Sequence, residues 1–530
     1  MKRILTLLLC LAMTAGLFAG CAAENRPYIP SGDALVYDDT DLNQLNQDEE
    51  KEPQEFSLAY YSDRSLNPIT STDYTNRTIF SLVYQGLFSV NSDYEAVPIL
   101  CDRYEVSSNY KIYTVYLRED ARFSDGSVLT VDDVLASYEA ARNSKYFGGR
   151  FTHIADISGS GTAIVFTLSV EMENLLLLLD IPIVKSTEVE AESPLGSGPY
   201  MLEKTMTGAH LRKNADWWCS SPDLVVRAEA IPLISCDSPT AIRDQFEFED
   251  VGLVCADPCS DSYADFRCDY EVWDCESGVF LFLAVNVKYS EYFEDNARVI
   301  SNLTYGIDRE TLAEDNYRGF AQAVTLAASP SSPYYSMGLA SKYDYDPVQL
   351  VNAVNNAKKP EEPLNLLVNR DDSLRLRTAR DIAQMLTDCG LETVTVEKNS
   401  SDFQKWILAG NYDMYLGQTR LSANMDLSPF FKPWGDMSYN GISDESLYSL
   451  CKDALENSGN YYTLHQAVAN DGRITPILFC NYAVYAERGL LTDLQPSRDN
   501  VFYYTLGRSE ADALIPIDYD STGDVVTGVG

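Results

Sequence analysis

Two patterns of apolar residues predict strands in this chain. Segment 111–117 alternates, with Tyr113, Val115 and Leu117 on one face, as in a half-buried strand. Segment 278–287 is instead apolar at almost every position, which is typical of a strand covered on both faces. Between such strands, Thr130 to Asp133 resembles a capping box and predicts a helix over 132–142. The chain therefore mixes strands with capped helices.

The clearest local architecture lies in residues 364–417. Its pattern predicts a strand, a helix ended by Gly390, a second strand, a second helix and a third strand, at 364–368, 373–389, 394–396, 401–409 and 412–417. Strands that alternate with helices at this spacing favour a mainly parallel sheet covered by helices. We therefore predict an α/β protein.

The first residues resemble an export signal with a lipobox. A short positive head precedes an apolar run, 4–18, that is too short to span a membrane comfortably. Small residues then precede Cys21, as in bacterial lipoproteins, and that resemblance implies cleavage before Cys21 and a lipid on its sulfur. An ordinary secretory signal with an incidental cysteine is the alternative. We therefore predict that residues 1–20 are a lipoprotein signal peptide.

Two acidic segments flank the predicted folded body. Residues 21–55 are rich in Asp, Glu, Asn, Gln and Pro and hold few large apolar residues, so we expect a flexible linker. Residues 509–530 have a similar character, and we expect a disordered acidic tail.

Net charge excludes some classes of partner. The chain has 79 acidic and 40 basic residues and a formal net charge of −39. A nucleic-acid binder needs clustered Lys and Arg to face phosphates, so we expect no nucleic-acid partner. Electrostatic attraction to anionic lipid is also disfavoured. We therefore expect contact with a membrane only through the lipid anchor.

The spacing of the cysteines and histidines in the sequence does not match that of a metal site. Three histidines stand far apart, and four cysteines cluster at Cys255, Cys259, Cys268 and Cys275. The cysteine spacing lacks the Cys-x-x-Cys knuckle of zinc sites. Disulfides and free thiols both remain open for the ten cysteines other than Cys10 and Cys21. We assign no metal and no cofactor.

Motifs of common enzyme classes are missing from the sequence. There is no Gly-x-Ser-x-Gly, His-Glu-x-x-His, P-loop or Gly-x-Gly-x-x-Gly. A missing motif does not exclude an enzyme, but it lowers the expectation of one, and we predict a protein that is not an enzyme. The rival interpretation is a surface-attached hydrolase, which would need an acid and base pair in a cleft.

Seven segments, in order, resemble one family of transport proteins. They read Ser-Leu-Asn-Pro, Tyr-Gln-Gly-Leu-Phe, Phe-Ser-Asp-Gly, Gly-Ser-Gly-Pro-Tyr, Asn-Ala-Asp-Trp-Trp, Ala-Val-Asn-Val and Gly-Ile-Asp-Arg, beginning at residues 65, 84, 123, 196, 214, 284 and 306. The chain is similar to the extracytoplasmic solute-binding proteins of ABC importers, in the dipeptide/oligopeptide/nickel class (family 5). The resemblance runs from about residue 56 to residue 505.

The resemblance implies a two-lobed, periplasmic-binding-protein-like fold of class II with an extra α+β domain in the first lobe. We expect lobe I to contain 56–90, 186–277 and 468–508, an inserted α+β subdomain to contain 91–185, and lobe II to contain 278–467.

The same resemblance implies a lipid-anchored receptor. It would capture a small solute between the lobes and deliver it to an ABC permease with its ATPase subunits. A peptide is the favoured solute, and a nickel chelate or a sugar is the alternative. We expect a monomer at the outer face of the cytoplasmic membrane.

Eight residues near the predicted interlobe segments are candidate ligand contacts: Asn67, Tyr84, Asn286, Arg420, Asn424, Asp426, Trp434 and Tyr439. In peptide-binding relatives an acid in the last stretch meets the amino terminus of the peptide. Many relatives have Asp where Asn424 stands, so Asp426 is the remaining acid. Each of these residues has a structural alternative: a turn for Asp426, a surface ion pair for Arg420, and core packing for Trp434 and Tyr439.

Overall fold

The computed structural model describes residues 56–206, 208–219, 224–260, 262–263, 266–491, 494–502 and 504, and the backbone of 517–519. Within these ranges, no helix is both long enough and apolar enough to cross a membrane. Cys21, the signal peptide and linker, and most of the predicted tail lie outside the described residues.

The largest sheet contains strands from both halves of the described chain. Its order is β15-β14-β16-β12-β17-β11-β1-β10-β9-β8, and β13 also pairs with β17. The bounds are β1 (Leu58–Tyr61), β8 (Tyr200–Thr205), β9 (Gly208–Lys213), β10 (Ala230–Cys236), β11 (Leu253–Ala256), β12 (Tyr270–Val285), β13 (Ala321–Ala323), β14 (Leu364–Asn369), β15 (Thr393–Lys398), β16 (Met414–Arg420) and β17 (Ile474–Glu487).

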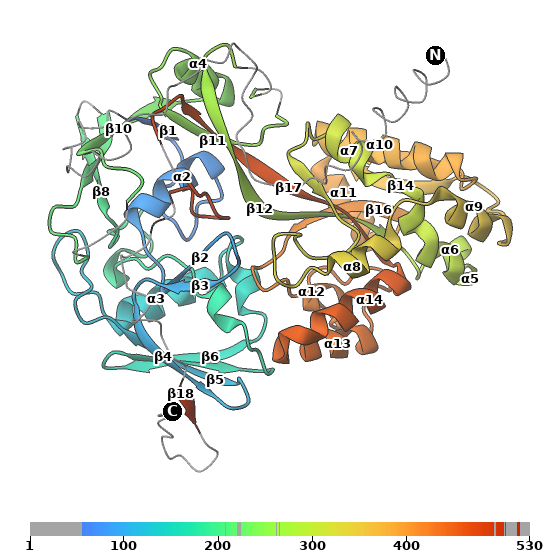
Figure 1. The fold of residues 1–530 in the computed structure, drawn as a ribbon, viewed down its shortest axis with the longest axis horizontal. Coiled ribbons are helices and arrows are strands. Elements are labelled where there is room, and N and C mark those ends of the chain that lie inside the picture. The colour runs from blue at the N-terminus through green and yellow to red at the C-terminus, as the bar shows by residue number, and fades with distance from the viewer. Residues whose placement is uncertain are drawn as a thin grey trace, which may run out of the picture. The chain divides into compact units, whose positions relative to one another are not determined.

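Two long antiparallel strands, β12 and β17, connect the two ends of this sheet. Figure 1 shows them side by side, running from the strands around β1 to those around β14. Their register shifts between Glu276 and Val279, where Gly278 has a φ of +71°. A glycine suits this bulge because the left-handed region is strained for residues with a Cβ. Gly278 therefore marks a bend in the connecting ribbon.

A second sheet has the order β18-β4-β5-β7-β6. Its bounds are β4 (Cys101–Ser107), β5 (Ile112–Leu117), β6 (Ile154–Ser160), β7 (Ala163–Leu168) and β18 (Ile517–Tyr519), and the short pair β2 (Phe88–Val90) and β3 (Ala96–Pro98) lies separately. The backbone of β18 pairs in parallel with β4, so part of the segment that we expected to be a disordered tail forms a strand.

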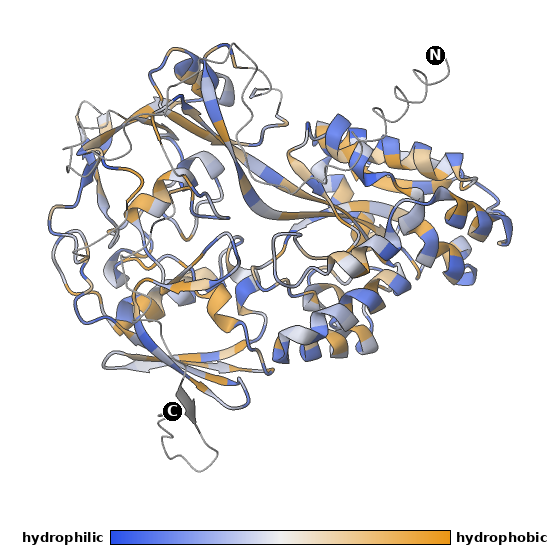
Figure 2. Cartoon of the chain, in the orientation of Figure 1, coloured by the Kyte–Doolittle hydropathy of each residue, from blue (hydrophilic) through white to orange (hydrophobic). Residues whose placement is uncertain are grey.

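Helices fill the connections between the strands. The α-helices are α2 (Tyr74–Val83), α3 (Val131–Arg142), α4 (Pro239–Glu247), α5 (Glu291–Asp295), α6 (Ala297–Asn302), α7 (Arg309–Asp315), α8 (Met337–Ala340), α9 (Pro347–Asn355), α10 (Ser373–Asp388), α11 (Ser400–Ala409), α12 (Ser428–Phe431), α13 (Glu445–Glu456) and α14 (Tyr461–Asp471). Hydrophilic and hydrophobic residues are interspersed along the helices that flank the sheet (Figure 2), as expected where one helix face is buried.

The hydrophobic cores divide at the bend in the ribbon. On β12, Phe280 and Phe282 pack into one core and Leu281 and Leu283 into another, on the opposite face of the sheet. Two other cores are built mainly from residues before Gly278 and from the end of β17 onward. We call the part around these two cores the first lobe, and the part around the cores that flank β12 after Gly278 the second lobe.

Most predicted elements are confirmed. Residues 364–420 form the expected strand–helix succession, and β14 pairs in parallel with both β15 and β16. The capping box of α3 is present, and Asp73 caps α2 by accepting a hydrogen bond from the N–H of Asn76. Helix α2 ends at Val83 because the next residues are extended and Gln85 bridges to Ile183.

Candidate functional site

A cavity with about 580 Å³ of empty space, including its open side, lies between the lobes. The first lobe contributes Tyr146, Gly149 and Arg150, which follow α3, and the segment after β17 contributes Arg498. The second lobe contributes the end of β16 and the loop around α12, with Thr419, Arg420, Leu421, Ser422, Asp426, Pro429, Phe430 and Met437.

A second cavity, with about 680 Å³ of empty space, adjoins the first at Arg498. Its lining comes from α2, from residues 84–90 and from the loop 497–500 of the first lobe. Arg77, Arg498 and Asp499 are among its polar residues. Charged side chains therefore lie where the two cavities meet.

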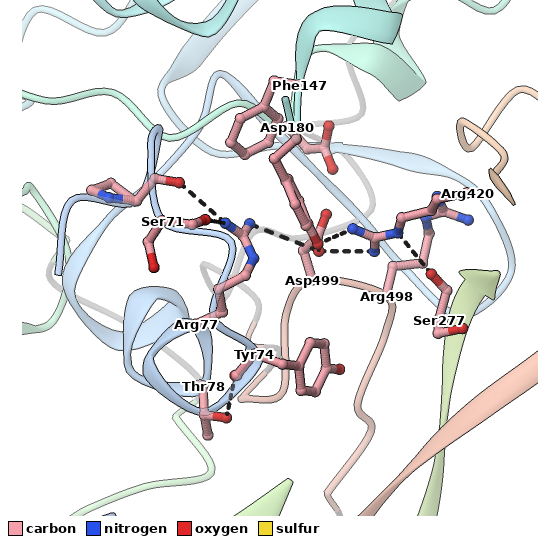
Figure 3. A network of polar contacts seen from close by, with 12 residues as sticks. Ser71, Tyr74, Arg77, Thr78, Phe147, Asp180, Ser277, Arg420, Arg498 and Asp499 are labelled. Carbon is pink, nitrogen blue, oxygen red and sulfur yellow. Dashed lines mark hydrogen bonds and ion pairs between the residues drawn. The ribbon is translucent and has the colours of Figure 1, made fainter. Parts of the chain in front are cut away.

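Asp499 is the centre of a cluster of buried charges. Its carboxylate lies 2.8 Å from Arg420 Nη2, 3.0 Å from Arg150 Nη2 and 3.8 Å from Arg77 Nη2. Figure 3 shows Arg77 and Arg420 approaching Asp499 from opposite sides. The hydroxyl of Tyr146 also donates to Asp499 and accepts from Arg420. Since Arg420 ends β16 and Asp499 follows β17, this ion pair joins the two lobes.

The arginines keep Asp499 ionised. Burial alone would raise the pKa of the Asp499 carboxyl, but Arg420, Arg77, Arg150 and Arg498 together hold that pKa far below its usual range. Burial lowers the pKa of Arg150 to about 10, so its guanidinium is still charged at neutral pH. Arg150 also pairs with Asp180. The cluster is therefore an ionic network that is largely but not fully removed from water, since the side chains of Asp499 and Arg420 are 17% and 24% exposed.

Arg498 is the fourth guanidinium and is 4% exposed. Its Nη2 donates to the carbonyl oxygen of Leu421 at 2.7 Å, whereas its Nε and Nη1 have no hydrogen-bond partner among the described residues. A Cβ at Gly278 would lie 2.7 Å from Nη1, so the guanidinium packs directly against the bend of the ribbon. The position of the Arg498 guanidinium thus requires a residue without a side chain at 278.

A second polar contact joins the lobes at Asp426. His153, from the first lobe, places Nε2 at 3.1 Å from the Asp426 carboxylate, and the pair is buried. Asp426 also accepts a hydrogen bond of 2.8 Å from the N–H of Ser428 at the start of α12. Burial opposes ionisation of Asp426, but His153 and Ser428 lower its pKa below the usual value. Asp426 therefore stabilises the turn at the start of α12, which is the structural role given above as the alternative to ligand contact.

Three of the other predicted ligand contacts form hydrogen bonds to backbone carbonyl groups of the protein itself. The side chain of Asn67 donates to the carbonyl oxygens of Val189 and Ala191, and that of Asn286 donates to those of Gly410 and Tyr412. The hydroxyl of Tyr84 donates to Leu66 and Pro194, although its side chain borders the second cavity. The two asparagines fix loops and line neither cavity.

The three remaining predicted contacts, Asn424, Tyr439 and Trp434, line neither cavity. Asn424 is fully buried, and its amide donates to the side-chain oxygen of Asn174 at 3.3 Å. Tyr439 is half-buried beside Tyr415 and lines neither cavity. The prediction of an aromatic wall or core packing is wrong for Trp434, which is 98% exposed. Its backbone lies in the left-handed region, with a φ of +61°.

Sequence reasoning found Arg420 and Asp426 but missed the rest of the charged cluster. Arg77, Arg150 and Asp499 stand far apart in the chain, and each is a common type of residue in a polar context. One signal was available: the pair Arg498-Asp499 follows a Pro-Ser turn in a segment otherwise poor in charge pairs. Sequence alone could not show that this pair returns to the interlobe cavity.

The ten described cysteines are all free thiols. Among the residues that the structure describes, no group of three or more His, Cys, Asp or Glu side chains is arranged to hold a metal ion.

Comparison with known proteins identifies the family. The family model described as "Bacterial extracellular solute-binding proteins, family 5 Middle" matches residues 95–441. The chain belongs to this family, as the sequence motifs predicted. The matched residues include all of the residues that line the interlobe cavity except Arg498.

Individual relatives are distant. The chain is 22% identical over 320 residues to the glutathione-binding protein GsiB of Salmonella typhi, a match that covers 56% of this chain and 60% of the relative. The chain thus spans about 60% of the length of the curated relatives that it matches.

Two solved structures have the same fold. The ABC transporter substrate-binding protein CtaP of Listeria monocytogenes matches with a TM-score of 0.70 and 17% identity, over 85% of this chain and 98% of that one. The oligopeptide-binding protein AppA of Bacillus subtilis, solved with a nonapeptide, matches with a TM-score of 0.62 and 19% identity, over 86% and 100%. The predicted two-lobed, periplasmic-binding-protein-like fold is confirmed.

Proposed function

We propose that this protein is the substrate-binding component of an ABC importer. It captures a small solute, a peptide in the favoured case, between its lobes and delivers it unaltered to a permease driven by ATPase subunits. The observation that carries the proposal is the interlobe cavity, which is lined by Tyr146 and Arg150 from one lobe and by Arg420 and Asp426 from the other. Such a site is completed only when the lobes meet.

Family membership and the relatives support a peptide. GsiB is named for binding glutathione, and AppA was solved with a nonapeptide. A peptide offers both charged ends and backbone groups, and the cavity offers both signs of charge and polar neighbours. A nickel chelate or a sugar remains the alternative solute.

The test is a binding screen that also detects turnover. The purified chain is heated with defined di- to pentapeptides, nickel–histidine chelates and sugars, and its melting temperature is recorded. A bound solute at a hundred times its Kd stabilises the folded state by about 2.7 kcal/mol. We expect at least one peptide to raise the melting temperature and to be recovered intact by mass spectrometry.

Small-angle scattering provides the second measurement. We expect the protein to become more compact with that peptide, because closure brings the lobes together. Cleavage of the peptide would contradict the proposal and favour the hydrolase. A screen in which no solute raises the melting temperature would also contradict it.

We further propose that Cys21 carries the lipid that holds the protein at the outer face of the cytoplasmic membrane. The supporting observation is the run of a positive head, an apolar stretch and small residues that ends at Cys21. We expect Cys21→Ala to release the protein from the membrane fraction, whereas Cys219→Ala, its matched control, stays there. Unchanged membrane association of Cys21→Ala would refute the anchor.

A further inference from the structure

Segment 172–174, which follows β7 in the first lobe, contacts the second lobe outside both cavities. The backbone N–H of Glu173 donates to the carbonyl oxygen of Leu455 in α13 at 2.8 Å. The Glu173 carboxylate accepts hydrogen bonds of 3.0 Å and 2.7 Å from the N–H and the hydroxyl of Ser458, which follows that helix. These residues line neither cavity, so the contact joins the lobes without occupying the solute site.

The next residue, Asn174, is buried among polar groups of the second lobe. Its side-chain nitrogen donates to the hydroxyl of Tyr334 at 3.3 Å and to that of Tyr461 at 3.4 Å. Its side-chain oxygen accepts from the amide of Asn424 at 3.3 Å. The two tyrosine rings are stacked, with their centroids 4.3 Å apart, which fixes both hydroxyls. All of these partners belong to the second lobe, so Asn174 exchanges each of them for water when the lobes separate.

Two leucines add apolar area to this contact between the lobes. Leu177 follows the segment in the first lobe, but its side chain packs in the second-lobe core that contains Phe280. Leu455 of α13 packs in the first-lobe core that contains Tyr113. Both leucines are buried, and separation of the lobes would expose them to water. Burial of apolar area therefore favours the closed arrangement together with the hydrogen bonds.

The first lobe holds segment 172–174 in a fixed shape. The hydroxyl of Tyr113, from β5, donates to the carbonyl oxygens of Met172 at 2.6 Å and Glu173 at 3.0 Å. The N–H of Met172 donates to the carbonyl oxygen of Tyr110. The segment therefore keeps its shape through contacts within its own lobe, and little conformational entropy is lost when it meets the second lobe.

Helix α13 lies next to the sheet of β4 to β7 and away from the ribbon of β12 and β17 (Figure 1). We propose that segment 172–174 is a latch, which stabilises the closed lobes by direct protein contacts, with Glu173 as its polar anchor. This inference rests on the proposed function, in which closure captures the solute. Because the latch lowers the free energy of the closed form and contacts no solute, it raises the affinity for every solute by the same factor.

The experiment removes the anchor and uses no solute. Glu173→Ala deletes the acceptor of both hydrogen bonds from Ser458. Glu171→Ala is the matched control, because Glu171 lies two residues earlier, is partly exposed and pairs with Lys111 of the same lobe at 3.7 Å. Amide hydrogen exchange of the full chain is followed by mass spectrometry, with fragmentation that resolves residue 173. Small-angle scattering gives the radius of gyration of each variant.

We expect the amide of residue 173 to exchange about tenfold faster in Glu173→Ala than in Glu171→Ala, after correction for intrinsic rates. The reason is that loss of hydrogen bonds to a charged group lowers the ratio of closed to open lobes by about that factor. We also expect a larger radius of gyration, which local fraying of the segment would not produce. Ser458→Ala removes one donor from the other lobe, and we expect it to change both measurements in the same direction.

Equal exchange rates, or equal radii of gyration, in Glu173→Ala and Glu171→Ala would overturn the latch. Protection of the amides of β5 shows that a variant is folded, and if Glu173→Ala loses that protection, Ser458→Ala decides by the same two measurements. Failure here is distinguishable from failure of the proposed function, because no solute is present. A chain that binds a solute in the screen but shows equal exchange in both variants loses the latch and remains a receptor.

Discussion

Replacing Asp499 by asparagine tests whether one carboxylate holds the charged cluster together. The substitution keeps the size of the side chain and removes its charge. Asp499 lies within 4 Å of Arg420, Arg150 and Arg77, and it accepts a hydrogen bond from Tyr146. In the Asp499→Asn variant, the one remaining ion pair of these three guanidinium groups among the described residues would be that of Arg150 with Asp180.

The expected loss is large because the site is buried. Removing one partner of a buried ion pair costs about 3–5 kcal/mol in unfolding free energy, since the other charge remains without water or a counter-ion. With an m-value of about 3 kcal/mol/M in urea, the unfolding midpoint falls by about 1–1.7 M. Glu229→Gln is the control, because Glu229 pairs with Lys213 and its side chain is 78% exposed. We expect it to change the midpoint little.

The pH dependence of this difference follows from the pKa of Asp499. The pKa of this carboxyl is depressed in the folded protein, so its stabilising contribution is present above the unfolded value of about 3.9 and is lost as the pH falls below it. We expect the difference in midpoint between the unsubstituted chain and Asp499→Asn to be constant from about pH 5 to 8 and to shrink below about pH 4. An Asp499→Asn midpoint equal to that of the unsubstituted chain at pH 7 would refute the reasoning.

Three further predictions concern other parts of the molecule. Burial lowers the pKa of His465 to about 4, and neither ring nitrogen has a partner among the described residues, so the fold loses about 3 kcal/mol as the pH falls from 6.5 to 4. His465→Leu is expected to lessen that loss in urea titrations at pH 7 and 4.5, and an unaltered pH dependence would contradict the assignment. Gly278→Ala is expected to destabilise the protein more than Gly489→Ala, because both have positive φ but only at Gly278 would the new Cβ collide with Arg498; equal melting temperatures would argue against that collision. Reduction with dithiothreitol should leave the melting temperature unchanged, and a shift on reduction would reveal a disulfide. Alkylation of the folded protein should be confined to the partly exposed thiols Cys219, Cys259, Cys268 and Cys480.

Local pattern was sufficient for much of the fold. The strand–helix succession of residues 364–420 and the capping box of α3 follow from short-range periodicity and capping chemistry, which depend on neighbours in the chain. The apolar run after Gly278 predicted a strand buried on both faces, and Phe280 and Leu281 indeed enter different cores. The ordered motifs then led to the correct family.

The candidate site required the tertiary structure. Arg77, Arg150, Arg420 and Asp499 come from four distant parts of the chain, and no local pattern distinguishes them from other polar residues. Trp434 shows the converse, because this aromatic residue of the predicted site stretch is exposed to solvent and lines neither cavity.

The sequence by itself determined where this chain forms strands and helices and which family it belongs to, because those properties reside in neighbouring residues and in motifs that keep their order. Only the tertiary structure decided which charges meet. The pairing of β12 with β17 brings the segment that follows β17 back to the bend at Gly278, and there Arg498 and Asp499 reach the loop that follows β16. Electrostatic energy depends on distance in space and on burial, and neither can be read from separation along the chain.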